Sequence, residues 1–156
     1  MTEEEIIHFV GGLPGVITVT ASEADGSPES AWGDSFFFYD PDGSTQPDNR
    51  FPFATIVVSD YEGFDTSSKL NRPGVFRLNI NVGRTAFQEL IGYSPAAHAQ
   101  HSEEFDYAAL DRLIPHPAYA TQAWVSILNP EQSGSKARAL LEQAHARAAA
   151  RHRPRH

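Results

Sequence analysis

The stretch that decides the fold reads R-P-G-V-F-R-L-N-I-N-V-G and runs from Arg72 to Gly83. Its apolar residues occupy every second position: Phe76, Leu78, Ile80 and Val82. The positions between them carry the polar side chains Arg77, Asn79 and Asn81. Because side chains alternate across a strand, the apolar set faces one side of a sheet and the polar set the other. The pattern predicts a two-faced strand over residues 75–82.

The polar row of this strand has two interpretations. The Arg77 guanidinium is a planar fork of donors, and each Asn amide offers a donor and an acceptor, so the row could bind a carboxylate, phosphate or amide ligand. Alternatively, the row faces water on the side of the sheet that the helices leave open. If helices cover that side instead, the same groups must find partners within the protein.

Four further segments have the residue pattern of strands, at residues 16–20, 34–39, 53–59 and 123–128. The second of these is aromatic on both faces, with Phe36 and Phe38 on one and Phe37 and Tyr39 on the other. A strand that is apolar on both faces is typical of the interior of a sheet. We therefore expect residues 34–39 to be a central strand.

Helices are expected at both ends of the chain. Thr2 and Glu5 form a capping box for a helix that ends at Gly11, and Ser135 caps a last helix that reaches about His152. Shorter helices are expected at residues 85–91 and 105–113, and a helical turn at 65–70. The resulting fold class is α+β, with an about five-stranded, mainly antiparallel sheet and the N- and C-terminal helices packed on one face.

Length and composition indicate one soluble domain. The 156 residues are 40% hydrophobic, which favours a single domain over residues 1–150, with a basic and frayed tail at 151–156. The turn-rich loop at residues 40–50 is the expected mobile segment. The chain has no cysteine, a basic signal sequence is absent and no apolar run is long enough to span a membrane. The expected location is the cytoplasm.

The charge of the chain is unevenly distributed. The formal net charge is −8, but residues 1–135 hold 6 Lys and Arg against 19 Asp and Glu, whereas residues 136–156 hold 6 against 1. An acidic body repels phosphate backbones, so nucleic acid is not an expected partner. The basic end suits the C-terminus of a helix, where cations are stabilised. The expected partner is a small molecule or a protein.

Asp34 and the aromatic residues around it are candidates for a ligand site. Asp34 could pair with Arg77 or accept a hydrogen bond from a ligand, and Trp32, Tyr39 and Trp124 would supply aromatic surface. The alternative is that Asp34 is a turn residue at the start of a strand and that Trp32 belongs to the core. A buried pair of Asp34 and Arg77 would add specificity more than stability, because desolvation offsets the attraction.

His116 is the best candidate for acid–base chemistry. The prolines on either side restrict the backbone to extended geometry, and Tyr119 follows closely in the sequence. A histidine held in this way could act as a general acid or base together with Tyr119 and Asp34. The alternative is a structural corner in which His116 bonds to the backbone.

A weak metal motif lies upstream. His98 and His101 would share one helical face, and Glu104 could be a third ligand. The spacing is not that of H-E-x-x-H, so a polar surface turn is the favoured interpretation and we expect no metal. The sequence also lacks G-x-S-x-G, the P-loop pattern and G-x-G-x-x-G, and we expect no cofactor.

Several long motifs resemble a bacterial family, the domain-of-unknown-function family 6194. They are A-W-G-D-S-F-F-F-Y-D (residues 31–40), F-P-F-A-T-I-V (51–57), L-N-R-P-G-V-F-R-L-N-I (70–80), F-D-Y-A-A-L-D-R-L-I-P-H-P-A-Y-A (105–120) and W-V-S-I-L-N-P (124–130). The resemblance covers residues 4–150 and implies no established activity. A second resemblance, to the YjbR-like double-wing proteins, rests on Leu13-Pro14-Gly15, Trp124 and the last helix and implies a fold.

Two functions follow from the sequence. The first is a binding module that takes a small molecule or a protein on the aromatic and Arg/Asn face of the sheet. The second is a small enzyme, cofactor-free or metal-assisted, that acts on a small molecule such as one of a biosynthetic pathway, through His116, Tyr119, Asp34 and Arg77. An enzyme requires these groups to converge on a concave site, whereas a binding module requires only an exposed groove.

Overall fold

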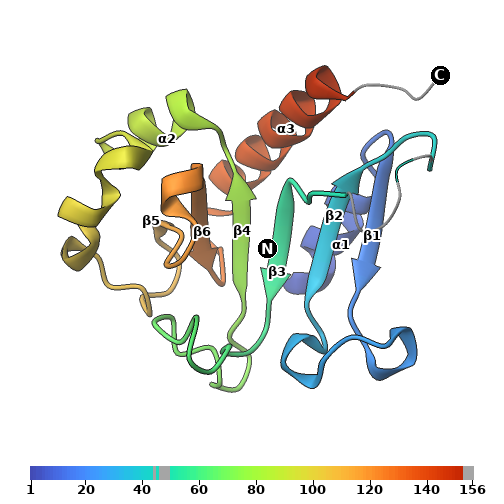
Figure 1. Cartoon of the computed structure of the whole chain (residues 1–156), viewed down its shortest axis with the longest axis horizontal. Coiled ribbons are helices and arrows are strands. Elements are labelled where there is room, and N and C mark those ends of the chain that lie inside the picture. Colours follow the sequence, from blue (N-terminus) through green and yellow to red (C-terminus); the bar gives the residue numbers. More distant parts are fainter. Residues whose placement is uncertain (44, 46–49, 153–156) are drawn as a thin grey trace.

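The computed structural model describes residues 1–43, 45 and 50–152, and its centre is one antiparallel sheet (Figure 1). The strands are β1 (Val16–Thr20), β2 (Ser35–Tyr39), β3 (Ala54–Val57), β4 (Arg77–Asn81), β5 (Leu113–Pro115) and β6 (Trp124–Leu128). The helices are α1 (Glu3–Gly11), α2 (Arg84–Ile91) and α3 (Gly134–Arg151). Short 3-10 turns are η1 (Glu23–Asp25), η2 (Glu29–Ala31), η4 (Pro95–Gln100), η5 (Ser102–Glu104) and η6 (Ala120–Gln122).

The sheet confirms the α+β class and the antiparallel arrangement, but it has six strands. Their order is β1-β2-β3-β4-β6-β5, and each neighbouring pair is antiparallel. The predicted central position of the aromatic strand β2 is confirmed, since β1 and β3 flank it. The strand not expected from the sequence is β5, which has only three residues and ends in a proline at the edge of the sheet.

The helix expected at residues 105–113 does not form, and β5 begins at its last residue. The Asp106 carboxylate accepts the N–H of Ala108 at 3.0 Å, which gives the backbone a turn in place of a helix. Asp111 then has a left-handed backbone (φ 58°), which ends any helical path before Leu113. The helical turn expected at residues 65–70 is also wrong, because Tyr61 and Asp65 form a bridge there and extended and turn residues follow.

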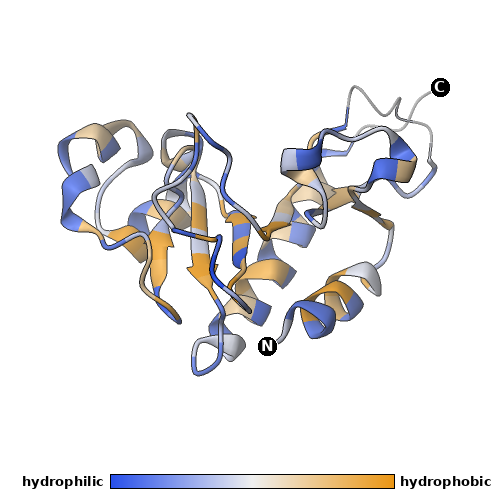
Figure 2. Cartoon of the chain, turned by 90° about the horizontal axis from the view of Figure 1, so that it is seen from below, coloured by the Kyte–Doolittle hydropathy of each residue, from blue (hydrophilic) through white to orange (hydrophobic). Residues whose placement is uncertain are grey.

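The first and last helices cover one face of the sheet, as the sequence predicts. In Figure 1 both α1 and α3 lie behind the strands. The shared core holds Ile6 and Val10 of α1 and Leu140 and Leu141 of α3, together with the apolar side of β4. Figure 2 shows the apolar colour concentrated on the strands and on parts of the helices, and the polar colour over the loops. We call the face without these helices the outer face.

The ends of the helices follow from local chemistry. The predicted capping box of α1 is present, since the Thr2 hydroxyl accepts from the Glu5 N–H at 3.1 Å and the Glu5 carboxylate accepts from the Thr2 N–H at 2.9 Å. Helix α3 begins at Gly134 and ends at Arg151. Its N-cap residue is Ser133, which lies two positions before the predicted cap Ser135. Residues 44 and 46–49 of the predicted mobile loop, and 153–156 of the predicted tail, lie outside the described residues.

Candidate functional site

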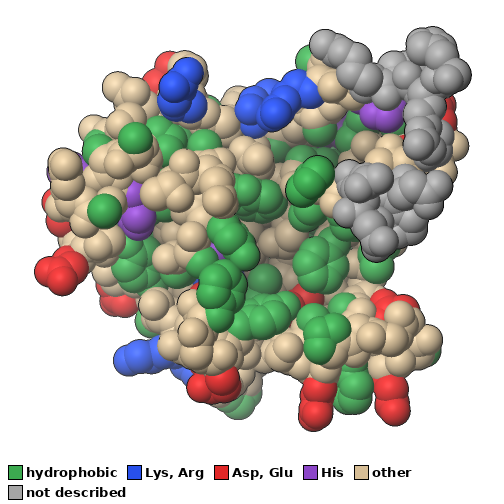
Figure 3. Space-filling view, viewed as in Figure 1, with side chains coloured by type: hydrophobic (Ala, Val, Ile, Leu, Met, Phe, Trp, Pro, Cys, Tyr) green, Lys and Arg blue, Asp and Glu red, His purple; other side chains and the backbone are tan. Residues whose placement is uncertain are grey.

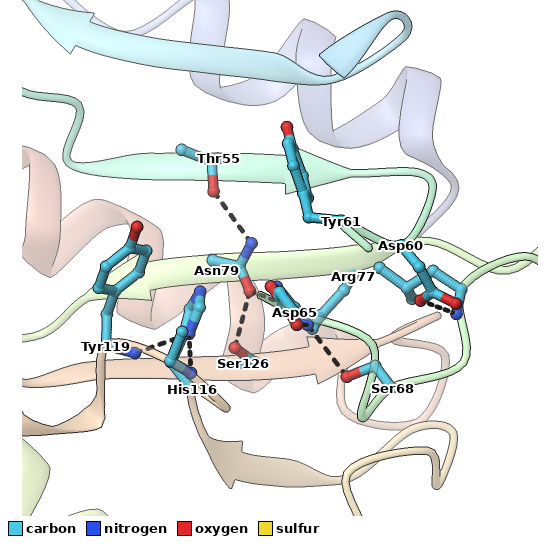
Figure 4. A network of polar contacts seen from close by, with 12 residues as sticks. Thr55, Asp60, Tyr61, Asp65, Ser68, Arg77, Asn79, His116, Tyr119 and Ser126 are labelled. Atoms are coloured by element: carbon cyan, nitrogen blue, oxygen red, sulfur yellow. Dashed lines mark hydrogen bonds and ion pairs between the residues drawn. The ribbon is translucent and has the colours of Figure 1, made fainter. Parts of the chain in front are cut away.

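The polar row of β4 is buried at one end of the strand. Arg77 has no exposed surface and forms a two-pronged ion pair with Asp65, with Nη1–Oδ1 at 3.0 Å and Nη2–Oδ2 at 2.6 Å. Its Nη1 also donates to Ser68 Oγ at 3.0 Å. Asp65 and Ser68 both come from the β3–β4 connection, which therefore covers the outer face over Arg77 (Figure 4).

Asn79 continues this network across the sheet. Its Oδ1 accepts from Arg77 Nε at 2.8 Å and from Ser126 Oγ at 2.7 Å, and its Nδ2 donates to Thr55 Oγ1 at 3.0 Å. Thr55 and Ser126 are its direct cross-strand neighbours on β3 and β6. Arg77 and Asn79 thus have the internal partners that a covered polar row requires, and they hold three strands in register.

Asp34 does not form the ion pair with Arg77 that the sequence suggests, because Asp65 occupies that position. Instead its Oδ1 accepts the Val58 N–H at 2.9 Å, and its Oδ2 accepts from the Tyr61 hydroxyl. Burial raises the pKa of Asp34 despite these two hydrogen bonds and the nearby charge of Arg77. Burial would also raise the pKa of Asp65, but the hydrogen bonds and the charge of Arg77 outweigh it and hold that pKa below its ordinary value.

His116 forms the structural corner that was one of its two interpretations. Its Nδ1 accepts the N–H groups of Ala118 at 2.9 Å and Tyr119 at 3.0 Å, so the proton of the neutral ring is on Nε2 (Figure 4). Burial lowers the pKa of His116 to about 3, and the charge of Arg77 acts in the same direction, while Asp65 opposes it. At neutral pH this ring is a hydrogen-bond donor through Nε2, not a base.

Aromatic side chains surround this corner, some exposed and some half-buried. The Tyr119 ring lies 4.9 Å from the His116 ring and 5.9 Å from the ring of Phe64, which is 61% exposed. Trp124 meets His116 edge-on at 6.3 Å. Trp32 is apart from them: it is 37% exposed and donates its Nε1–H to the Ser27 carbonyl at 2.9 Å. It therefore neither enters the core nor joins the other aromatic candidates.

The two weak metal candidates have other partners. His98 Nδ1 lies 2.8 Å from the Tyr93 hydroxyl, and His101 Nδ1 lies 2.6 Å from a Glu104 carboxylate oxygen. Both imidazoles stack on the Tyr93 ring. Within residues 1–43, 45 and 50–152, no group of three His, Asp or Glu side chains has the arrangement of a metal site.

The other end of the polar row opens into a hollow of about 740 Å³. Asn81, Tyr39 and Trp124, which the sequence places on three different strands, all line it. Its other lining residues are Phe38, Thr45, Arg50, Phe51, Pro52, Phe53, Gln122, Ala144, Arg147, Ala148, Arg151 and His152. Figure 3 shows a hollowed centre on the outer face, with Lys and Arg side chains along its upper edge over α2 and α3.

The sequence missed the partners that decide which part of the row is accessible. Asp65 and Ser68 lie in a loop with no regular pattern, so nothing marks them as partners of Arg77. Ser126 carries a signal, because it is the polar position of an apolar strand, W-V-S-I-L, but its meaning requires the β4–β6 register. Arg147 belongs to the alanine-rich last helix, and its contribution to the hollow depends on how that helix crosses the sheet.

The comparison with known families agrees with the quoted motifs, since one family matches the chain over residues 1–156. The chain belongs to the family of unknown function DUF6194. No curated protein and no solved structure shows significant similarity to it, so the likeness to the YjbR-like double-wing proteins stays a prediction. No helix among the described residues of this DUF6194 member is long and apolar enough to cross a membrane.

Proposed function

We propose that this protein binds a small molecule in the hollow between the ends of β2, β4 and β6 and the C-terminal half of α3. The observation that carries this proposal is the meeting of Asn81, Tyr39 and Trp124 at one hollow of about 740 Å³. Sites for small ligands have volumes of roughly 300–1000 Å³, with aromatic walls and a few polar groups. We also propose the cytoplasm as its location, since a chain without cysteines gains no disulfide from an oxidising compartment.

Within the hollow, apolar and polar groups have separate roles. Phe38, Phe51 and Trp124 offer ring surfaces to the body of a ligand, and Phe51 is 86% exposed. Asn81 and Gln122 offer amide donors and acceptors that can orient it. The hydrogen bonds of the buried Asn79 to β3 and β6 support this wall from within the sheet.

A second candidate function is a small enzyme, and the observation that favours it is the cluster of titratable groups around Arg77. Asp34, Asp65 and His116 all interact electrostatically with this guanidinium, and each of the three has a displaced pKa. Such clusters are typical of catalytic sites and of structural networks alike. Because His116 holds its proton on Nε2, it would act in such an enzyme by donating a hydrogen bond to a reacting oxygen.

The binding proposal can be tested with 2-naphthamide, a neutral aromatic amide of the right size for the hollow. Its thirteen non-hydrogen atoms, at about 0.3 kcal/mol each, give a dissociation constant of roughly 1 mM. The chain has two tryptophans, so two indole N–H signals can be followed by NMR. We expect the indole N–H signal of Trp124, which lines the hollow, to shift saturably with ligand concentration. The signal of Trp32, which lies outside the hollow, should not shift. Absence of binding, or shifts of Trp32 alone, would refute the proposal.

A further inference from the structure

Two arginines of α3 line the hollow one helical turn apart. Arg147 and Arg151 are separated by four residues, so their side chains lie on the same face of the helix. Two like charges in this arrangement destabilise a helix by a few tenths of a kcal/mol. Within the described part of the chain, neither forms an ion pair with a carboxylate, whereas the third arginine of the wall, Arg50, pairs with Asp40 at 3.1 Å.

Arg147 lies against the end of β4 at the wall of the hollow. Its Nη1 donates to the Asn81 carbonyl at 3.4 Å. Its guanidinium lies directly against Gly83, where an added Cβ would be only 2.5 Å from Arg147 Cζ and 2.8 Å from Nε and Nη2. A Cβ at this position would displace the guanidinium, and the φ of +84° at Gly83 independently favours glycine. Partial burial and the neighbouring Arg151 lower the pKa of Arg147.

We infer that the ligand of this hollow is an anion, a carboxylate or a phosphate attached to an aromatic or apolar body. This inference rests on the proposed binding function and names its ligand class. An anion between Arg147 and Arg151 would cancel their mutual repulsion, and guanidinium groups bind carboxylates and phosphates through paired hydrogen bonds. The rings of Phe38 and Trp124 would contact the apolar body, as in other sites of this size.

The positive charge at the hollow contrasts with the negative charge of the protein as a whole. With a net charge of −8, the protein as a whole repels anions, so any preference for an anionic ligand must come from nearby groups. The negative end of the α3 dipole also stabilises cations there, and this is the alternative reason for the two arginines. That alternative gives the two arginines a role in the helix and no direct contact with a ligand.

The test compares 2-naphthoate with 2-naphthamide, which have the same ring and nearly the same shape but differ in charge. Isothermal titration calorimetry at low ionic strength, in a buffer without phosphate, should show 2-naphthoate binding at least tenfold more tightly. Arg147→Gln and Arg151→Gln should each remove most of this difference by weakening the binding of 2-naphthoate. Lys136→Gln is the matched control, since it removes one exposed positive charge from the same helix, outside the hollow. A third probe, 1-naphthyl phosphate, shows whether phosphate is preferred over carboxylate.

The possible outcomes separate the two proposals. Equal affinity for 2-naphthoate and 2-naphthamide, unaffected by Arg147→Gln, would overturn the anionic ligand and leave the binding function standing. Failure of all three probes to bind would overturn the binding function itself. An equal loss of 2-naphthoate affinity in Lys136→Gln and Arg147→Gln would also refute the inference, because it would show a diffuse effect of charge. Arg147→Lys keeps the charge but loses the planar fork, and we expect it to retain part of the preference.

Discussion

Lowering the pH from 7 to 5 should destabilise the fold through His116. The folded protein holds this ring neutral, with a pKa of about 3, whereas an unfolded histidine has a pKa of about 6.5. Between these values the unfolded state binds more protons, so this contribution to stability is complete above about pH 6.5 and is lost as the pH falls toward 3. For one such group the linkage relation gives a loss of about 2 kcal/mol between pH 7 and pH 5.

The matched variant for this prediction is His116→Asn. The Oδ1 of Asn can take the place of Nδ1 and accept the N–H groups of Ala118 and Tyr119, as in an Asx turn, but it does not titrate. Urea unfolding, followed by tryptophan fluorescence at pH 7, 6 and 5, gives the free energy of unfolding of the wild type and of the variant. Burial also lowers the pKa of His98, but this residue is present in both proteins, so its contribution to the pH dependence cancels in the comparison. If the wild type and His116→Asn lose the same free energy of unfolding, the reasoning about this buried ring is refuted.

Two further predictions concern the buried end of the polar row. Asp65→Asn leaves the Arg77 guanidinium buried without its counter-ion, which should cost about 3–5 kcal/mol and lower the melting temperature by roughly 6–20 °C. A decrease of less than about 3 °C in scanning calorimetry would contradict this. Asn79→Ala removes three hydrogen bonds of a buried side chain and should lower the melting temperature without affecting 2-naphthamide affinity in the folded protein. Asn81→Ala removes one hydrogen bond, to the Gly83 N–H, and should weaken 2-naphthamide binding with a smaller effect on the melting temperature. Equal behaviour of the two variants would show that the row is not divided in this way.

Much of the fold could be predicted because its signals are local. The capping box of Thr2 and Glu5 depends on residues three apart, and the alternation around Leu78 and Ile80 depends on residues two apart. The strand β5 gave no such signal, since three residues cannot show a period. The helix predicted at residues 105–113 is wrong because Asp106 and Asp111 set the backbone there through a side-chain hydrogen bond and a left-handed conformation.

The candidate site was harder to predict because its chemistry depends on partners distant in the sequence. The sequence supplied Asp34 and Arg77 as a plausible pair, but the true partner, Asp65, lies in an irregular connection that folds over the sheet. Competition between two carboxylates for one guanidinium is decided by the path of that connection. By contrast, the corner at His116 was among the interpretations, because the two flanking prolines restrict the backbone locally.

The division of one strand into a covered and an open part also explains why the same residue type has two roles. Asn79 and Asn81 lie two positions apart on the same face of β4, so no periodicity can distinguish them. Asn79 lies opposite Thr55 and Ser126, whose hydroxyl groups bind its amide, and it is 1% exposed. Asn81 lies opposite Trp124 and lines the hollow, and its Oδ1 accepts the Gly83 N–H of its own chain segment at 3.3 Å. The residues opposite each Asn, and not the Asn itself, therefore decide whether its amide is hydrogen-bonded across the sheet.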